Sequence, residues 1–207
     1  MEEIIVVGSG AQGLIVADIL QAAGLRPVAF VDENPSRHGS QVLGIPIIGS
    51  LDELRRTPHA GIVVAIGDNA TRRAVTDRLI AEGEHIVTAR HPFTSIAPDV
   101  RIGEGSMLSA GTIITPGAVI GRGVLLNTKS SVDHQSVLGD FAHVSAGGTV
   151  GANCIIGDET LIALGASVAS GRRVGARVVV GAGAVVVRDL PDDVVAYGVP
   201  ARVVRRV

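Results

Sequence analysis

The chain has 207 residues, enough for one large or two small domains, and 46% of them are hydrophobic although only 2% are aromatic. Its interior must therefore be built from Val, Ile, Leu and Ala. The formal net charge of −2, without a basic run interleaved with aromatic residues, gives no reason to expect nucleic-acid binding. The only cysteine, Cys154, excludes a disulfide framework and a four-cysteine zinc site.

The beginning of the chain carries no targeting pattern. Residues 1–4 are acidic at two positions and lead straight into an apolar run, without the basic end of a signal peptide. No apolar run reaches the length that spans a membrane. We therefore expect a cytoplasmic protein without membrane insertion.

Residues 1–32 have the pattern of half a dinucleotide-binding fold. A short apolar run, Ile4 to Val7, leads into the glycine turn Gly8 to Gly13, a helical pattern follows to Ala23, and a second strand ends at Asp32. The glycines would let the backbone approach a pyrophosphate, the helix N-terminus would supply N–H groups, and Asp32 could accept a ribose hydroxyl. The alternative is a turn that only packs helix on strand.

The next segment continues the α/β pattern. We expect a loop over residues 33–42, a capped helical turn at residues 50–54, a buried strand over residues 61–66, and one more strand at residues 85–90.

Asp68 or Asn69 can cap the helix that runs from there to about Gly83. Arg72 and Arg73 lie in its first turns, where they could face a ligand, because ligands of such sheets bind outside the carboxyl ends of the strands. A solvated helix face is the alternative for both arginines.

This sheet is only about half the size of a full two-lobed dinucleotide fold. We therefore favour a ligand shorter than NAD, such as a nucleotide sugar. The predicted domains are a Rossmann-like sugar-nucleotide-binding domain at residues 1–90 and a repeat domain at residues 91–207.

The repeat domain has a period of six residues. Every sixth residue is aliphatic, and the residue after it is usually small or polar. Neither an α-helix nor a half-buried strand has this period, whereas each hexad of a parallel β-helix forms one flat face of a coil. We predict roughly five coils of three hexads, with residues 189–202 folding back over the last one. The anchors are Ile96, Ile102, Leu108, Ile114, Ile120, Leu126, Val132, Leu138, Val144, Val150, Ile156, Ile162, Val168, Val174, Val180 and Val186.

Two histidines, His134 and His143, interrupt the surface of the coil. They are nine residues apart, or one and a half faces. A zinc site of three histidines would need a third ligand, and no other histidine lies beyond residue 92, so we expect no metal. Histidines that meet at a subunit interface remain an alternative.

His134 is a candidate general base. A neutral imidazole, with an ordinary pKa of about 6.5, is suited to removing a proton from an amine or hydroxyl that attacks an acyl carbonyl. Backbone N–H groups could stabilise the oxyanion. No Ser-His-Asp set is evident, so direct transfer is more economical than a covalent acyl-enzyme. A solvated or structural histidine is the alternative.

Several motifs together resemble the sugar O-acyltransferase family of sialic acid and bacillosamine pathways, and the resemblance covers essentially the whole chain. The motifs are Gly8 to Gly13, Val31-Asp32, Ala65 to Asn69, Leu126-Asn127-Thr128, Asp133-His134, Gly139 to Ser145, and the tail Gly198-Val199-Pro200-Ala201.

The resemblance implies a left-handed parallel β-helix, a homotrimer, and acetyl-CoA bound along the coil between subunits. His134 matches the family's general base, and His143 matches a residue that contacts acetyl-CoA. Ala152, Leu164 and Ala182 match positions that line this co-substrate. A UDP-amino sugar would bind in the N-terminal domain at Gly10, Ala11, Gln12, Asp32, Glu33 and Gly67.

Three departures from the family pattern stand out. Gln135 follows the base where the bacillosamine enzymes have an acid, so Asp133 or Asp140 would have to support the imidazole. Many relatives have His in place of Gln12. Two of the acetyl-CoA positions hold alanine where some relatives have glycine. The catalytic candidates are Asp133, His134 and Gln135.

We predict an acetyl-CoA-dependent N-acetyltransferase that acts on the 4-amino group of a UDP-amino-dideoxy sugar by direct transfer. Within the same class, the acceptor could be a hydroxyl of sialic acid or a related sugar. In a different class, the coil would be a non-catalytic trimeric scaffold whose N-terminal sheet senses a nucleotide.

Overall fold

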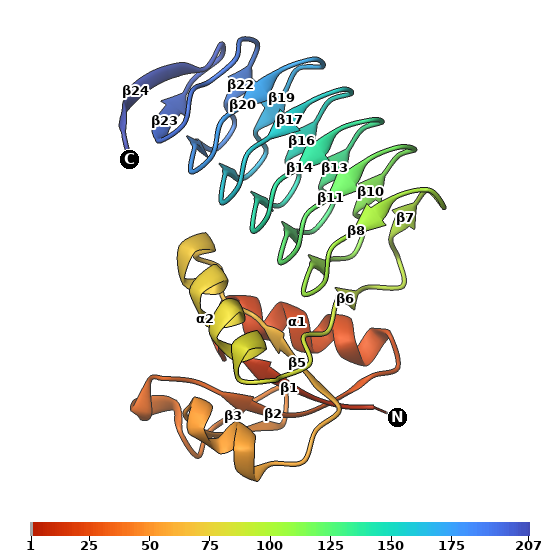
Figure 1. Ribbon diagram of the computed structural model, residues 1–207, viewed down its shortest axis with the longest axis vertical. Helices are drawn as coiled ribbons and strands as arrows, with labels where there is room; N and C mark the ends of the chain where they lie inside the picture. The colour runs from red at the N-terminus through yellow and green to blue at the C-terminus, as the bar shows by residue number, and fades with distance from the viewer. Residues whose placement is uncertain (1) are drawn as a thin grey trace. The chain divides into compact units, whose positions relative to one another are not determined.

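The computed structural model describes residues 2–207, and the chain divides into two compact units, Met1–Pro92 and Phe93–Val207. In Figure 1 the first unit runs from red to yellow and the second from green to blue.

The first unit is a small, mainly parallel sheet with helices. Its strands follow the order β3-β4-β2-β1-β5, and all neighbours are parallel apart from the β3–β4 hairpin. Strand β1 lies between β2 and β5 and is buried along Ile4 to Val7, as expected of a parallel strand with a neighbour on each side. The elements are β1 (Glu3–Val7), α1 (Ala11–Ala22), β2 (Arg26–Val31), η1 (Pro35–Arg37), β3 (Gln41–Val42), β4 (Ile45–Gly49), η2 (Leu51–Arg56), β5 (Gly61–Val64), α2 (Asn69–Ala81) and β6 (Ala89–Arg90).

The glycine turn joins β1 to α1 at close range. Gly8 has a φ of +95°, and a Cβ at Gly13 would overlap the Gly8 carbonyl oxygen. Glycine at both positions lets α1 begin directly at the end of β1. The predicted strand, turn and helix are therefore present, and the helix ends at Ala22, close to the expected residue.

The start of α2 differs from expectation at Arg72. Asp68 caps the helix as predicted, because its Oδ1 accepts the Thr71 N–H at 2.8 Å. Arg72 is fully buried and donates to the carbonyl oxygens of Ile66 and Gly67 at 2.9 and 3.1 Å. Both the ligand-facing and the solvated interpretation of Arg72 are thus wrong, since the side chain braces the loop between β5 and α2.

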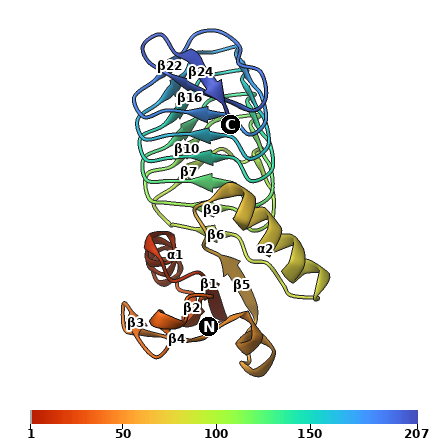
Figure 2. The ribbon, with the colours of Figure 1, turned by 90° about the vertical axis from the view of Figure 1, so that its left-hand side faces the viewer.

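The second unit is a parallel β-helix with three faces (Figures 1 and 2). Each strand within a face pairs with the strand one coil earlier and the strand one coil later, and the strands at the ends of faces 1 and 2 have one neighbour. Face 1 consists of β7 (Ser95–Ile96), β10 (Ile113–Ile114), β13 (Ser131–Val132), β16 (Thr149–Val150), β19 (Ser167–Val168) and β22 (Val185–Val186). Face 2 consists of β8 (Arg101–Ile102), β11 (Val119–Ile120), β14 (Val137–Leu138), β17 (Ile155–Ile156) and β20 (Arg173–Val174). Face 3 consists of β9 (Met107–Leu108), β12 (Leu125–Leu126), β15 (His143–Val144), β18 (Leu161–Ile162), β21 (Val179–Val180), β23 (Val194–Tyr197) and β24 (Arg202–Arg206).

The predicted anchors fill the coil. From Leu108 to Val186 each anchor is at most 2% exposed, and Ile96 and Ile102 are partly buried against the same cluster. An inward aliphatic side chain on every face explains how a chain with so few aromatic residues builds a core.

The C-terminal tail covers the last coil, as predicted. β23 pairs in parallel with β21, and β24 returns antiparallel to β23. Val194, Ala196 and Ala201 of the tail join the hydrophobic core of the coil. The tail therefore extends face 3 and closes the apolar end of the stack.

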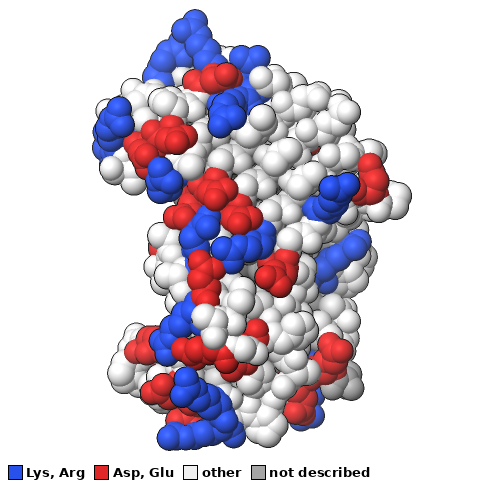
Figure 3. Space-filling model, in the orientation of Figure 1, with Lys and Arg blue, Asp and Glu red and all other residues white. Residues whose placement is uncertain are grey.

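Charged side chains of both signs alternate along the edge of the coil that Figure 3 shows. Ion pairs of this unit join Arg122 to Asp140, Arg172 to Asp189 and Arg177 to Asp193. Within residues 2–207, no helix is long and apolar enough to cross a membrane. In the same range, no three His, Cys, Asp or Glu side chains gather as a metal site would require.

Candidate functional site

A cavity of about 480 Å³ lies in the first unit at the carboxyl ends of β1, β2 and β5. This is where open parallel sheets bind ligands. Its walls are largely apolar and include Val7, Val31, Leu51, Ala65, Ile66 and Val75. The six predicted nucleotide-sugar residues all line this one cavity: Gly10, Ala11, Gln12, Asp32, Glu33 and Gly67. Their part in binding remains a prediction.

Asp32 already uses most of its acceptor capacity within the chain. Its Oδ2 accepts the N–H and the hydroxyl of Ser9 at 2.8 and 2.5 Å, and its Oδ1 accepts the Asn34 N–H at 2.9 Å. Arg37 lies 3.7 Å from Oδ2 and donates to the Ser9 hydroxyl. Asp32 therefore ties the glycine turn to the end of β2, and a ribose hydroxyl would have to compete with these bonds.

Two other polar side chains on the cavity have unused hydrogen-bonding capacity. The Gln12 Nε2 atom is buried and has no partner within residues 2–207. Glu33 accepts the Leu51 N–H through Oε1 at 3.0 Å, and in the described chain nothing donates to its Oε2. The cavity thus offers a ligand one amide donor and one carboxylate acceptor.

The α1 N-terminus also opens onto this cavity. Gly10, the N-cap, supplies no side-chain bond to the first turn, and no acidic residue lies in that turn. The first N–H groups of a twelve-residue helix are consequently available to a ligand anion.

On the α2 side of the cavity, sequence reasoning named the wrong residues. Arg72 and Arg73 were the candidates to face a ligand, whereas Ile66, Thr71 and Val75 line the cavity beside Gly67. Thr71 and Val75 are four residues apart on α2 and so share one helix face, which is a signal that the sequence contains. The cap at Asp68 fixes which face that is.

The second candidate site is the corner between face 1 and face 2 that holds Asp133, His134 and Gln135. His134 is exposed, and in the described chain its ring nitrogens have no hydrogen-bond partner. Gln135 has a φ of +58°, which belongs to the corner turn. Ala152 occupies the same corner one coil later, where Asn153 N–H bonds the His134 carbonyl oxygen at 2.9 Å.

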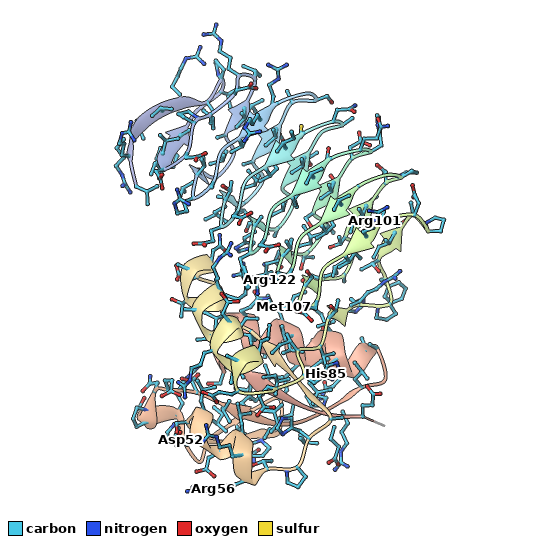
Figure 4. All side chains as sticks on the ribbon, viewed as in Figure 1. Asp52, Arg56, His85, Arg101, Met107 and Arg122 are labelled. Atoms are coloured by element: carbon cyan, nitrogen blue, oxygen red, sulfur yellow. The ribbon has the colours of Figure 1, made fainter. Side chains whose placement is uncertain are left out.

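Asp133 supports the backbone of His134 rather than its ring. Its Oδ1 accepts the His134 N–H and the Thr115 hydroxyl, each at 2.8 Å. These two bonds, with a smaller contribution from the His134 charge, lower the pKa of Asp133 below its ordinary value. Asp140 lies at the next corner, where it accepts Arg122 Nε at 3.1 Å (Arg122 is labelled in Figure 4). The structure therefore favours Asp133 over Asp140 as the neighbouring acid.

The remaining predicted co-substrate positions lie elsewhere on the coil. His143 is on β15 of face 3, paired with Leu125 and Leu161, and is partly buried. Leu164 and Ala182 occupy successive positions of the corner between face 3 and face 1, and both are exposed. His143 thus lies on face 3, and Leu164 and Ala182 lie along the edge where that face ends.

His134 and His143 are consequently not brought together within one chain. One coil takes 18 residues, because Val132 pairs with Ile114 and with Val150. Nine residues are half of that circuit, so the corner of His134 faces face 3 across the coil. A site that uses both histidines must draw them from two chains.

Comparison with known proteins gives a consistent result. Residues 3–79 match the PglD N-terminal domain. A histidine-to-asparagine variant of perosamine N-acetyltransferase from Caulobacter crescentus, solved with CoA and GDP-perosamine, is 35% identical with a TM-score of 0.94. That match covers 99% of this chain and 97% of the other. The chain belongs to the hexapeptide-repeat family of sugar acyltransferases.

Two further members of this family resemble the chain. The acetyltransferase domain of PglB from Neisseria gonorrhoeae, solved with acetyl coenzyme A, is 34% identical, covers 98% of this chain and 99% of its own, and has a TM-score of 0.92. The UDP-N-acetylbacillosamine N-acetyltransferase of Bacillus subtilis is 30% identical over 113 residues, and this alignment spans 53% of the chain and 52% of that relative.

These likenesses confirm the family predicted from the motifs. They also confirm the predicted fold class, a Rossmann-like sheet followed by a left-handed parallel β-helix. The predicted enzyme class, an acyltransferase that acts on sugars, is that of the family.

Proposed function

We propose that the chain transfers an acetyl group from acetyl-CoA to the 4-amino group of a nucleotide-activated amino-dideoxy sugar. The observation that carries the proposal is the exposed His134 imidazole, left without an internal partner in a chain that matches sugar N-acetyltransferases over nearly its whole length. Use of acetyl-CoA supports a cytoplasmic location.

In the proposed reaction the lone pair of the sugar amine attacks the thioester carbonyl carbon. His134 takes the proton that the amine loses, the carbon–sulfur bond breaks, and the leaving thiolate receives a proton from the imidazolium. Asp133 is ionised near neutral pH, like any aspartate whose pKa is not raised, and stabilises the transient positive charge on His134 from the adjacent position. Gln135 orients the substrate or the ring without carrying charge.

The proposal includes a cyclic homotrimer in which acetyl-CoA lies between two subunits. Support comes from the half-coil separation of His134 and Ala152 from His143, because one chain offers the two groups on opposite sides. Leu164 and Ala182 would line the same groove as His143.

Replacing His134 by alanine tests the base directly. We expect turnover, measured as thiol release from acetyl-CoA with a panel of nucleotide 4-amino sugars and free sialic acid, to fall about 100-fold or more. Acetyl-CoA binding by calorimetry should persist. His85→Ala is the matched control, since His85 is also exposed and lies in the other unit (Figure 4).

The outcomes of this assay distinguish between the candidate functions. Unchanged turnover in His134→Ala removes the base assignment. Activity on sialic acid alone would support the hydroxyl acceptor, and no transfer from the wild type to any sugar would support a non-catalytic scaffold.

Subunit mixing tests the shared site. His134→Ala chains and His143→Ala chains, each nearly inactive alone, should regain about one quarter of wild-type activity when co-expressed in equal amounts. One quarter follows because a site needs an intact His134 on one chain and an intact His143 on its neighbour. Tandem purification of differently tagged chains removes the homotrimers and raises the expected activity to about one third, because each mixed cyclic trimer keeps one intact site of three. A mixture as inactive as its parents argues for a site within one chain.

A further inference from the structure

Glu33 presents a fixed carboxylate at the wall of the first-unit cavity. Its Oε1 accepts the N–H of Leu51 at 3.0 Å, and both residues line the cavity. The bond holds the carboxylate beside the start of η2, the helix that carries Asp52 and Arg56 in Figure 4. Oε2 has no donor within residues 2–207, so the group is positioned and still able to accept hydrogen bonds.

The other carboxylate on the cavity cannot play this part as readily. Asp32 already accepts three hydrogen bonds from Ser9 and Asn34 and lies 3.7 Å from Arg37. Recognition of a polar ligand edge therefore falls to Glu33. Around it, Val31, Leu51 and Val75 supply the apolar surface that the faces of a planar ring require.

The four common nucleobases differ in how they can meet a carboxylate. Guanine presents two adjacent donors, the ring N1–H and the exocyclic N2–H, which match the two oxygens of a carboxylate. Uracil presents one N–H between two carbonyl oxygens, and the negative carboxylate would repel those oxygens. Adenine and cytosine each offer an amino donor beside an acceptor nitrogen, so one carboxylate oxygen would face a lone pair.

We propose that Glu33 makes the first unit selective for a guanine nucleotide, so that the sugar substrate is carried by GDP rather than by the UDP predicted from sequence. Glu33 accepts the N1–H and N2–H of the base, with Oε1 retaining the Leu51 N–H. Gln12 Nε2, buried and unpartnered on the same cavity, donates to an oxygen elsewhere on the nucleotide. The role of the nucleotide in acetyl transfer rests on the proposed function, but the choice of base does not.

The test is direct binding of free nucleotides by calorimetry to the full-length protein. We compare GDP, UDP and IDP, because IDP differs from GDP only by lacking the 2-amino group. The wild type should bind GDP at least about 10-fold more tightly than UDP and about 10-fold more tightly than IDP, since each lost charge-assisted hydrogen bond costs about that factor.

Glu33→Gln isolates the carboxylate. Glutamine keeps an oxygen for the Leu51 N–H but offers the base an amide NH₂ group instead of a second carboxylate oxygen. The ratio of the GDP affinity to the IDP affinity should therefore fall toward 1. Glu53→Gln is the matched control, because Glu53 lies in η2, bonds Arg56, and does not line the cavity. It should keep the wild-type ratios, and thermal unfolding of each variant checks that it is folded.

Three results would overturn the proposal: UDP binding as tightly as GDP, a GDP-to-IDP ratio unchanged by Glu33→Gln, or no nucleotide binding at all. GDP selectivity without acetyl transfer to any GDP-amino sugar would leave the guanine site in place and remove the proposed function. Acetyl transfer to a UDP-amino sugar, together with tighter binding of UDP than of GDP, would remove the guanine site and leave the proposed function in place.

Discussion

The Asp32 carboxylate holds the glycine turn by accepting two hydrogen bonds from Ser9, and protonation at low pH removes the charge of this carboxylate. Burial alone would raise the pKa of Asp32, but the Ser9 hydroxyl, the Asn34 and Ser9 N–H groups and the Arg37 charge together lower it below its ordinary value. A carboxylate with a lowered folded-state pKa stabilises the fold above its unfolded pKa of about 3.9. That stability is lost as the pH falls through the folded-state pKa.

Asp32→Asn should therefore destabilise the protein at pH 7 and much less at acidic pH. We expect the free energy of unfolding at pH 7, measured by urea titration, to fall by about 1–2 kcal/mol, because charged hydrogen bonds to Ser9 are replaced by neutral ones. The difference from wild type should shrink as the pH is lowered below about 4. The exposed Asp18→Asn is the control, and a pH-independent difference would contradict the argument.

For single residues, the sequence predicted where side chains lie better than it predicted their hydrogen-bond partners. Six candidates fell on one cavity because a glycine turn after a parallel strand and an acid after the next strand fix the same sheet edge. The saturation of Asp32 by Ser9, and the burial of Arg72 against Ile66 and Gly67, depend on contacts between loops that no periodicity encodes.

Among the structural elements, the corners of the coil carry buried hydroxyls that link successive turns. Thr160 is fully buried, donates to the Gly175 carbonyl oxygen at 2.6 Å and accepts the Val178 N–H at 3.1 Å. Ser136 makes the same pair of bonds to Gly151 and Cys154. At such corners the hydroxyl satisfies backbone groups that the two-residue strands leave unpaired.

Thr160→Val should remove both bonds while keeping the volume of the side chain. We expect the free energy of unfolding to fall by about 1–3 kcal/mol, because a buried carbonyl and a buried N–H lose their partner. Thr160→Ser, which retains the hydroxyl and loses one methyl, should cost less than about 1 kcal/mol. Equal losses in the two variants, measured by chemical denaturation, would show that packing rather than hydrogen bonding matters here.

For the whole molecule, the six-residue period predicted the second unit well. It fixed which residues face inward, where the faces lie and that a tail would cover the end, because each inward position must bury an aliphatic side chain. The hydroxyl links at the corners were not predicted, since serine and threonine also occur in exposed turns. The placement of His134 and His143 on opposite sides of one coil was contained in their spacing of nine, half of the 18-residue circuit.

The fixed circuit also constrains how this chain can change in length. Deleting one hexad, such as residues 145–150, would keep every later anchor in the core but turn every later outward residue onto the neighbouring face. Leu164 and Ala182 would then leave the edge beside His143, although the coil could still fold. Only insertions or deletions of whole 18-residue coils preserve both the core and the surface. A variant that gains or loses a single hexad should therefore still fold but lose activity.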